Sequence, residues 1–121
     1  MKYLALIYGE EGRWADLSPE QRESELGEYI ALSKADVTVG GDELDSVTTA
    51  TTVRVRGDET LVTDGPFAEL KEVLGGYYVF ECDTIDEACT WAAKIPAARH
   101  GAIEVRPVYV DPNANGTGEA S

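Results

Sequence analysis

The chain has 121 residues, 43% of them hydrophobic and 27% charged, which is enough for one domain with a hydrophobic core but not for two. Its formal net charge of −13 repels phosphate groups and therefore disfavours nucleic acids and anionic membranes as partners. No apolar run is long enough to span a bilayer, and no signal peptide is visible, so we expect a cytoplasmic protein.

The sequence offers little metal or disulfide chemistry. Cys82 and Cys89 fit neither a disulfide framework nor a zinc site, and we expect both thiols to be reduced. The acidic cluster of Asp42, Glu43 and Asp45 lacks the spacing of a calcium loop and is typical of a solvated loop. We therefore expect no metal and no other cofactor.

Hydrophobic periodicity and turn residues divide the chain into strands, helices and an inserted hairpin. In chain order, the predicted elements are a strand at 2–8, a polar loop at 10–16, a helix from 19 to about 35, a strand at 37–39, hairpin strands at 51–56 and 59–63, a single helical turn at 68–74, a strand at 75–82, a helix from 85 to about 95 and a strand at 102–110. These elements form one domain at 1–110. The composition of residues 111–121 predicts a disordered tail.

Both predicted helices begin with a capping pattern. Ser18 and Gln21 form a capping box around Pro19, and Thr84 with Glu87 repeats the pattern. On the first helix, we expect the acidic residues Glu23, Glu25 and Glu28 to lie mostly on the exposed face. On the second, the expected buried stripe consists of Ile85, Ala88, Cys89, Ala92 and Ile95.

The order of the elements predicts an α+β, ferredoxin-like βαββαβ fold with an inserted β-hairpin. Both helices then cover one face of an antiparallel sheet, and Pro107 places the last strand at its edge. The strands at 2–8 and 75–82 are apolar on both faces, so the second face also needs cover. A second copy packed sheet against sheet would supply it, and we expect a homodimer with a two-fold axis.

A family resemblance rests on the residues Met1-Lys2-Tyr3-Leu4, Ile7-Tyr8-Gly9, Gly40-Gly41, Thr52-Val53-Arg54, Thr63-Asp64-Gly65-Pro66-Phe67, Lys71-Glu72, Gly75-Gly76-Tyr77 and Ile103-Glu104-Val105-Arg106-Pro107. Up to about Val108 the chain resembles the DGPF branch of the YCII-related proteins. The resemblance implies a bacterial protein with the dimeric α/β barrel also used by muconolactone isomerases and antibiotic-biosynthesis monooxygenases. Some similar proteins are encoded near extracytoplasmic-function sigma factors. Type members carry a His–Asp pair proposed as catalytic, with the histidine at the start of the first helix, whereas the single histidine of this chain is His100.

Asp64 is the first candidate for a catalytic residue. Gly65 permits positive φ and Pro66 restricts φ, so the turn holds the Asp64 carboxylate in one direction and Phe67 should enter a pocket. In that position Asp64 would act as a general base or anchor a ligand. Alternatively, Asp64 stabilises its own turn through the backbone.

His100 and Arg106 are further candidates. His100 titrates near neutrality and is a candidate catalytic acid or base, although its place before Gly101 indicates exposure. Arg106 would hold a ligand carboxylate inside an apolar cavity, or would instead pair with Glu104 or Glu81.

Tyr8, Phe67 and Tyr78, together with Arg106, are the candidate ligand-binding residues, and ordinary packing in the dimer core is the alternative for the two tyrosines. The sequence favours a protein that binds a small apolar or carboxylate-bearing molecule in a cavity near the dimer interface. Cofactor-independent proton transfer is one option, and whether the protein is an enzyme stays open. The alternatives are a non-catalytic regulatory or protein-interaction module associated with sigma-factor signalling, and an assembly protein without a small-molecule site.

Overall fold

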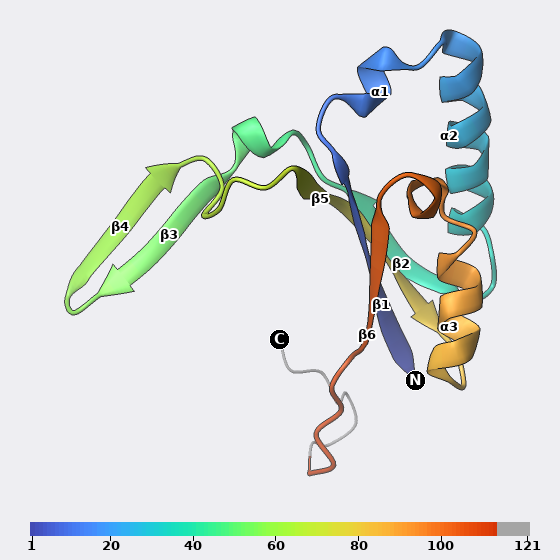
Figure 1. Ribbon diagram of the computed structural model, residues 1–121. Helices are drawn as coiled ribbons and strands as arrows, with labels where there is room; N and C mark the ends of the chain where they lie inside the picture. The colour runs from blue at the N-terminus through green and yellow to red at the C-terminus, as the bar shows by residue number, and fades with distance from the viewer. Residues whose placement is uncertain (114–121) are drawn as a thin grey trace.

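The computed structural model describes residues 1–113 and contains a four-stranded sheet with helices on one face and a separate two-stranded hairpin (Figure 1). The sheet consists of β1 (Lys2–Glu10), β2 (Thr38–Glu43), β5 (Glu72–Glu81) and β6 (Ala102–Pro107). The hairpin consists of β3 (Thr51–Arg56) and β4 (Glu59–Asp64). The helices are α1 (Arg13–Asp16), α2 (Pro19–Ser33), α3 (Ile85–Ala92) and the short 3₁₀ turns η1 (Val47–Thr49) and η2 (Pro96–Arg99). Of the tail predicted at 111–121, residues 114–121 lie outside the described residues.

The sheet has the strand order β2-β5-β1-β6, and every pairing in it is antiparallel. Helix α2 connects β1 to β2, and α3 connects β5 to β6, which is the ferredoxin-like order. The α+β prediction is confirmed, and β6 lies at an edge as Pro107 indicates, because proline has no N–H to donate to a further strand. No helix in the described part of the chain is both long and apolar enough to cross a membrane.

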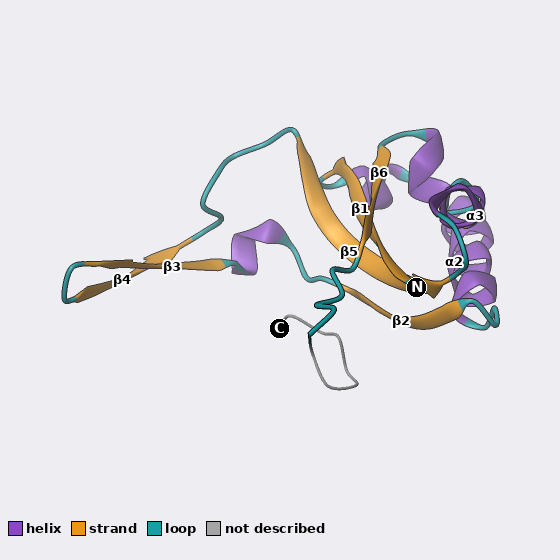
Figure 2. Cartoon of the chain, turned by 90° about the horizontal axis from the view of Figure 1, so that it is seen from below, coloured by secondary structure: helices purple, strands orange, loops and turns teal. Residues whose placement is uncertain are grey.

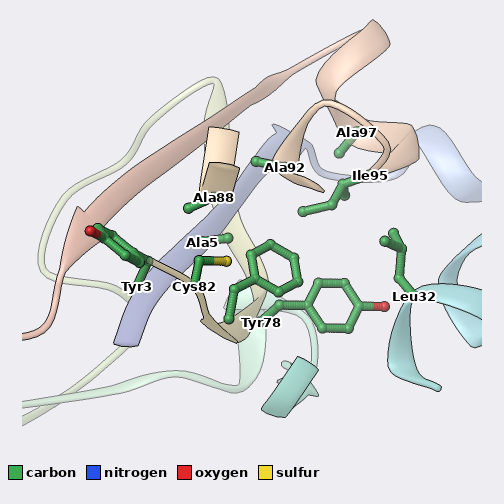
Figure 3. Packing of buried hydrophobic residues seen from close by; sticks show 10 residues of the cluster. Tyr3, Ala5, Leu32, Tyr78, Cys82, Ala88, Ala92, Ile95 and Ala97 are labelled. Carbon is green, nitrogen blue, oxygen red and sulfur yellow. The ribbon is translucent and has the colours of Figure 1, made fainter. Parts of the chain in front are cut away.

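The hydrophobic core lies between the sheet and the helices (Figure 3). Its buried side chains are Tyr3, Ala5, Leu32, Tyr78, Phe80, Cys82, Ala88, Ala92, Ile95 and Ala97. Phe80 is fully buried, and its ring stacks on that of Tyr78 with the centroids 5.8 Å apart. The small side chains Ala88 and Ala92 let α3 approach the sheet closely, so that Phe80 fills the space between the two layers.

The first capping box is confirmed, because the Gln21 N–H donates to Ser18 Oγ at 3.1 Å and the Ser18 N–H donates to Gln21 Oε1 at 2.9 Å. The second box is half formed. Thr84 Oγ1 accepts from the Glu87 N–H at 3.2 Å, but the Glu87 carboxylate accepts from the Asp83 N–H instead of the Thr84 N–H.

Helix α3 is shorter than predicted, and its buried stripe is narrower. It ends at Ala92 instead of Ile95, which has an extended backbone because a following proline disfavours the helical region. Ile85 and Cys89 of the predicted stripe are exposed. In an eight-residue helix that packs through Ala88 and Ala92, a neighbouring position such as Cys89 is turned by about 100° away from the sheet.

The helical turn predicted at 68–74 is wrong. Glu72 already belongs to β5, because β1 continues to Glu10 and supplies backbone partners for Leu74, Val73 and Glu72 after a register shift between Ile7 and Tyr8. Smaller differences concern element boundaries: the loop predicted at 10–16 contains α1, α2 ends at 33, β2 covers 38–43, β4 ends at 64, β5 ends at 81, and β6 ends at 107. Asp42 and Glu43 are therefore strand residues and not part of a loop.

The hairpin of residues 51–64, here called the arm, projects away from the body on the side of the sheet opposite the helices (Figures 1 and 2). Within the described residues its strands pair only with each other. Every arm residue except Thr52 is exposed. The face of the sheet that points away from α2 and α3, here called the open face, carries the half-buried apolar residues Leu4, Leu6, Tyr8, Tyr77 and Val79.

Candidate cleft between α2 and the sheet

A cleft of about 1050 Å³ lies between α2, α1 and the adjoining ends of β1, β2 and β5. Its lining includes the apolar side chains Ile7, Trp14, Leu26, Ile30, Val73 and Leu74. Leu26 and Ile30, both on α2, are 51% and 45% exposed. Apolar side chains left accessible in a concave surface are typical of a small-molecule site.

The turn after η2 places His100 in the wall of the cleft. The Gly101 N–H donates to the Ala97 carbonyl at 2.7 Å, which closes the turn. Gly101 lies so close to β1 that a Cβ at this position would overlap the carbonyl oxygen of Tyr8. A glycine is therefore required for His100 to lie beside the end of β1.

An ion pair between Arg13 and Glu25 borders the same cleft. Arg13 donates from both terminal nitrogens to the Glu25 carboxylate, at 3.1 and 2.8 Å. The Glu25 side chain is 12% exposed and that of Arg13 is 30% exposed. The hydrogen bonds from Arg13 lower the pKa of Glu25 although burial raises it, so Glu25 is ionised at neutral pH.

The electrostatic surroundings of His100 favour its neutral form. Partial burial and then the positive charges of Arg13 and Arg99 lower the pKa of His100, while the carboxylates of Glu25 and Glu72 act in the opposite direction. The imidazole is therefore neutral at pH 7 and has a lone pair that can accept a proton.

Two tyrosines and a serine form a hydrogen-bonded wall deeper in the cleft. The Tyr78 hydroxyl donates to the carbonyl oxygen of Tyr29 at 2.9 Å and lies 3.4 Å from Ser33 Oγ. Burial raises the pKa of the Tyr29 hydroxyl, which stays protonated. Tyr78 is 7% exposed, so it fixes α2 to β5 and presents only a small part of its surface to the cleft.

The outer edge of the cleft is acidic. The carboxylates there belong to Glu10, Glu11, Asp42, Glu43 and Asp45. No group of histidine, cysteine and acidic residues within 1–113 is arranged to hold a metal ion. This edge repels anions and therefore disfavours a ligand that is negatively charged where it enters the cleft.

The structure places two of the six site residues predicted from the sequence, His100 and Tyr78, in the lining of this cleft. Asp64, Phe67, Tyr8 and Arg106 are not part of that lining. The two candidate catalytic residues, Asp64 and His100, are therefore not brought together within one chain.

The turn Asp64-Gly65-Pro66-Phe67 has the positive φ at Gly65 that the sequence permits, but its side chains do not enter a pocket within the chain. Gly65 has a φ of 99°, its N–H donates to the Ala50 carbonyl at 2.7 Å, and its carbonyl accepts from Thr52 Oγ1 at 2.7 Å. Asp64 is exposed at the end of β4. Phe67 is 78% exposed, so the expectation that it enters a pocket is wrong within the chain, because the segment from the arm to β5 packs against little else.

Tyr8 and Arg106 lie on the open face, on neighbouring strands of the sheet. Arg106 is exposed, and its Nε lies 3.9 Å from a carboxylate oxygen of Glu104, the alternative partner considered from the sequence. An exposed ion pair at this distance contributes little to stability and leaves the guanidinium accessible.

Sequence reasoning missed Arg13, Glu25 and Tyr29. Glu25 was expected on the exposed face of its helix, but it lies four residues before Tyr29 and seven before Leu32, on the stripe that faces the core. That spacing is the signal that identifies it. Arg13 has no comparable signal, because its position depends on how α1 folds over α2.

Comparison with known proteins gives two findings. The model of the YCII-related domain matches residues 1–110. An uncharacterized protein of Rhizobium meliloti (strain 1021) is 36% identical over 114 residues, which cover 89% of this chain and 92% of the relative.

Proposed function

We propose that this chain, which belongs to the YCII-related domain family, binds a small, mainly apolar molecule in the cleft beside α2. We further propose that His100 accepts a proton from the bound molecule, in chemistry that needs no cofactor. The observation that carries the proposal is the position of a neutral imidazole beside accessible apolar side chains.

The residues around the cleft have distinct roles in this proposal. Leu26 and Ile30 bury the apolar body of the ligand, and His100 meets its reactive C–H or O–H group. The ion pair of Arg13 and Glu25 keeps one positive and one negative charge in fixed positions near the imidazole. The acidic edge disfavours a carboxylate-bearing ligand in the cleft. Such a ligand would instead bind at Arg106 on the open face, near the interface of the proposed dimer.

We also propose that a second copy covers the open face. Leu4, Leu6 and Val79 are apolar residues on central strands, and they point away from both α2 and α3. A two-fold copy offers the same surface in return and removes these side chains from water.

The single histidine makes the test direct, because its imidazole gives one set of NMR signals that needs no assignment. The natural protein is titrated with neutral aromatic fragments and with the same fragments bearing a carboxylate. The proposal expects the neutral fragments to move the His100 signals and Leu26→Glu to abolish the effect. Fragments that bind without moving those signals would place the site elsewhere.

The two candidate bases are separated by matched variants. For any fragment that exchanges a C–H proton with solvent in the presence of the protein, His100→Gln should remove the exchange and keep the binding, whereas Asp64→Asn should change neither. Loss of exchange in Asp64→Asn alone would assign the reaction to Asp64 and refute the role of His100.

A non-catalytic regulatory or protein-interaction module, such as one associated with sigma-factor signalling, is the second candidate function. The exposed apolar arm favours it. Fragment binding at the cleft without any exchange or turnover, equal in the natural protein and in His100→Gln, would support this candidate over the enzyme.

A further inference from the structure

The end of β1 carries no side chain where it borders the cleft. Side chains alternate between the two faces of a strand, so Gly9 faces the same side of the sheet as Ile7, which packs against the hydrophobic core. Both residues line the cleft. The face of β1 that Tyr3, Ala5 and Ile7 cover in the core therefore continues as bare backbone at Gly9.

The fold does not require a glycine at this position. At Gly76, a Cβ would lie 2.9 Å from the carbonyl oxygen of Asp42, so the close approach of β2 and β5 excludes a side chain there. At Gly9, the nearest described atom outside the chain neighbours is Cε1 of His100, which lies 4.0 Å from the position of a Cβ. This is an ordinary van der Waals distance, and Gly9 is not among the glycines with positive φ. An alanine would therefore fit into β1 without strain.

The space that Gly9 leaves open lies directly beside the imidazole of His100. Cε1 is bonded to both ring nitrogens, so a ligand atom that rests on the Gly9 backbone in contact with Cε1 is close to the nitrogen that carries the lone pair. The apolar side chains of Leu26 and Ile30 line the same cleft. A ligand that contacts them through its body can extend over Gly9 to the imidazole.

From this geometry we propose that Gly9 is a specificity-determining residue of the cleft, because its missing side chain admits a flat ring to the imidazole. The bound molecule is then a neutral aromatic compound whose ring lies on the backbone of β1 and whose O–H or C–H group faces His100. The inference rests on the ligand site proposed above. It adds the shape of the ligand and the residue that limits its size.

The contact between position 9 and the imidazole is tested first without a ligand. In Gly9→Ala, the new methyl group should show a nuclear Overhauser effect to Hε1 of His100, because Cε1 lies 4.0 Å from the new carbon. The chain has a single histidine, so this hydrogen is identified directly. Absence of the effect in the folded variant would overturn the inference, since position 9 would then not face His100.

The limit on ligand size is tested with phenol and 2-naphthol, which share an O–H group and differ by one fused ring. NMR titration gives the Kd of each probe. In Gly9→Ala the Kd of 2-naphthol should rise by about tenfold or more and that of phenol by less than about threefold, because the larger ring has less room to avoid the methyl group. Gly27→Ala adds the same methyl group to α2 outside the cleft lining, and should leave both values unchanged.

The outcomes separate this inference from the proposed function. If the natural protein binds both probes and Gly9→Ala changes the two Kd values equally or not at all, the role of Gly9 is refuted and the cleft proposal stands. If the natural protein binds neither probe, the cleft is not a site for neutral aromatic molecules and both proposals fail. A greater loss for 2-naphthol than for phenol, confined to Gly9→Ala, supports both.

Discussion

The guanidinium of Arg13 donates two hydrogen bonds to the carboxylate of Glu25, at 3.1 and 2.8 Å, and joins the short helix α1 to α2 beside His100. The pair has opposite effects on the histidine, since Arg13 lowers the pKa of His100 and Glu25 raises it. This relationship makes the charge state of the cleft sensitive to single substitutions in either partner.

The first prediction follows from these opposite signs. Arg13→Gln should raise the pKa of His100, because the imidazolium loses a nearby cation and keeps the Glu25 carboxylate. Glu25→Gln should lower it further. NMR titration of the single histidine measures both, and shifts in the same direction would contradict the arrangement.

The second prediction concerns stability at low pH. The pKa of His100 in the folded chain lies below its ordinary value of 6.5, so the unfolded chain binds that proton more readily. The contribution of the neutral His100 side chain to the free energy of unfolding is complete above pH 6.5 and decreases as the pH falls toward the folded pKa. Urea unfolding at a series of pH values should show this decrease in the natural protein and its absence in His100→Gln.

Glu25 makes the stability of the protein depend on pH in a second, lower range. Its folded pKa lies below the ordinary value of 4.5, so the stability due to its pair with Arg13 is present above pH 4.5 and is lost as the pH falls through the folded pKa. Glu25→Gln should be less stable than the natural protein above pH 4.5, by about 1.5–3 kcal/mol for a charged hydrogen-bonded group. The difference between the two proteins should shrink below that pH. A constant difference would mean that Glu25 acts through packing alone.

The third prediction compares two isoleucines of the stripe expected on α3. Ile95 is fully buried, whereas Ile85 is 44% exposed. Ile95→Ala should cost about 2–5 kcal/mol of unfolding free energy because it leaves a cavity, and Ile85→Ala should cost less than about 1 kcal/mol. Equal losses in denaturant titrations would show that Ile85 is buried in solution.

The fourth prediction compares two glycines. Gly101→Ala should destabilise the protein by about 1–3 kcal/mol, because the new Cβ overlaps the Tyr8 carbonyl oxygen, and it should displace His100. Gly27 lies within α2 with nothing near its missing Cβ, so Gly27→Ala should stabilise the protein by about 0.5–1 kcal/mol. Thermal unfolding shows whether each substitution raises or lowers the stability, and the NMR signals of His100 show whether the side chain is displaced. A neutral Gly101→Ala would mean that the turn can move away from β1.

The order of the elements, the start of α2 and the edge position of β6 could be predicted from the sequence, because each depends on residues close together in the chain. Ser18 and Gln21 satisfy the first helical N–H groups by themselves, and Pro107 lacks a donor in any context. The apolar character of residues 2–8 on both faces likewise indicates a central strand without knowledge of its neighbours.

Only the tertiary structure decided which side chains form the cleft. Arg13, Glu25 and His100 belong to α1, α2 and the turn after η2, and no local pattern specifies that these three segments meet. Their meeting depends on the close approach of Gly101 to Tyr8 and on the packing of α2 against β5 through Tyr78 and Tyr29. The same reason explains why 68–74 is not a helical turn: the partners that β1 offers beyond its register shift stabilise a strand there, and those partners are more than 60 residues away in the sequence.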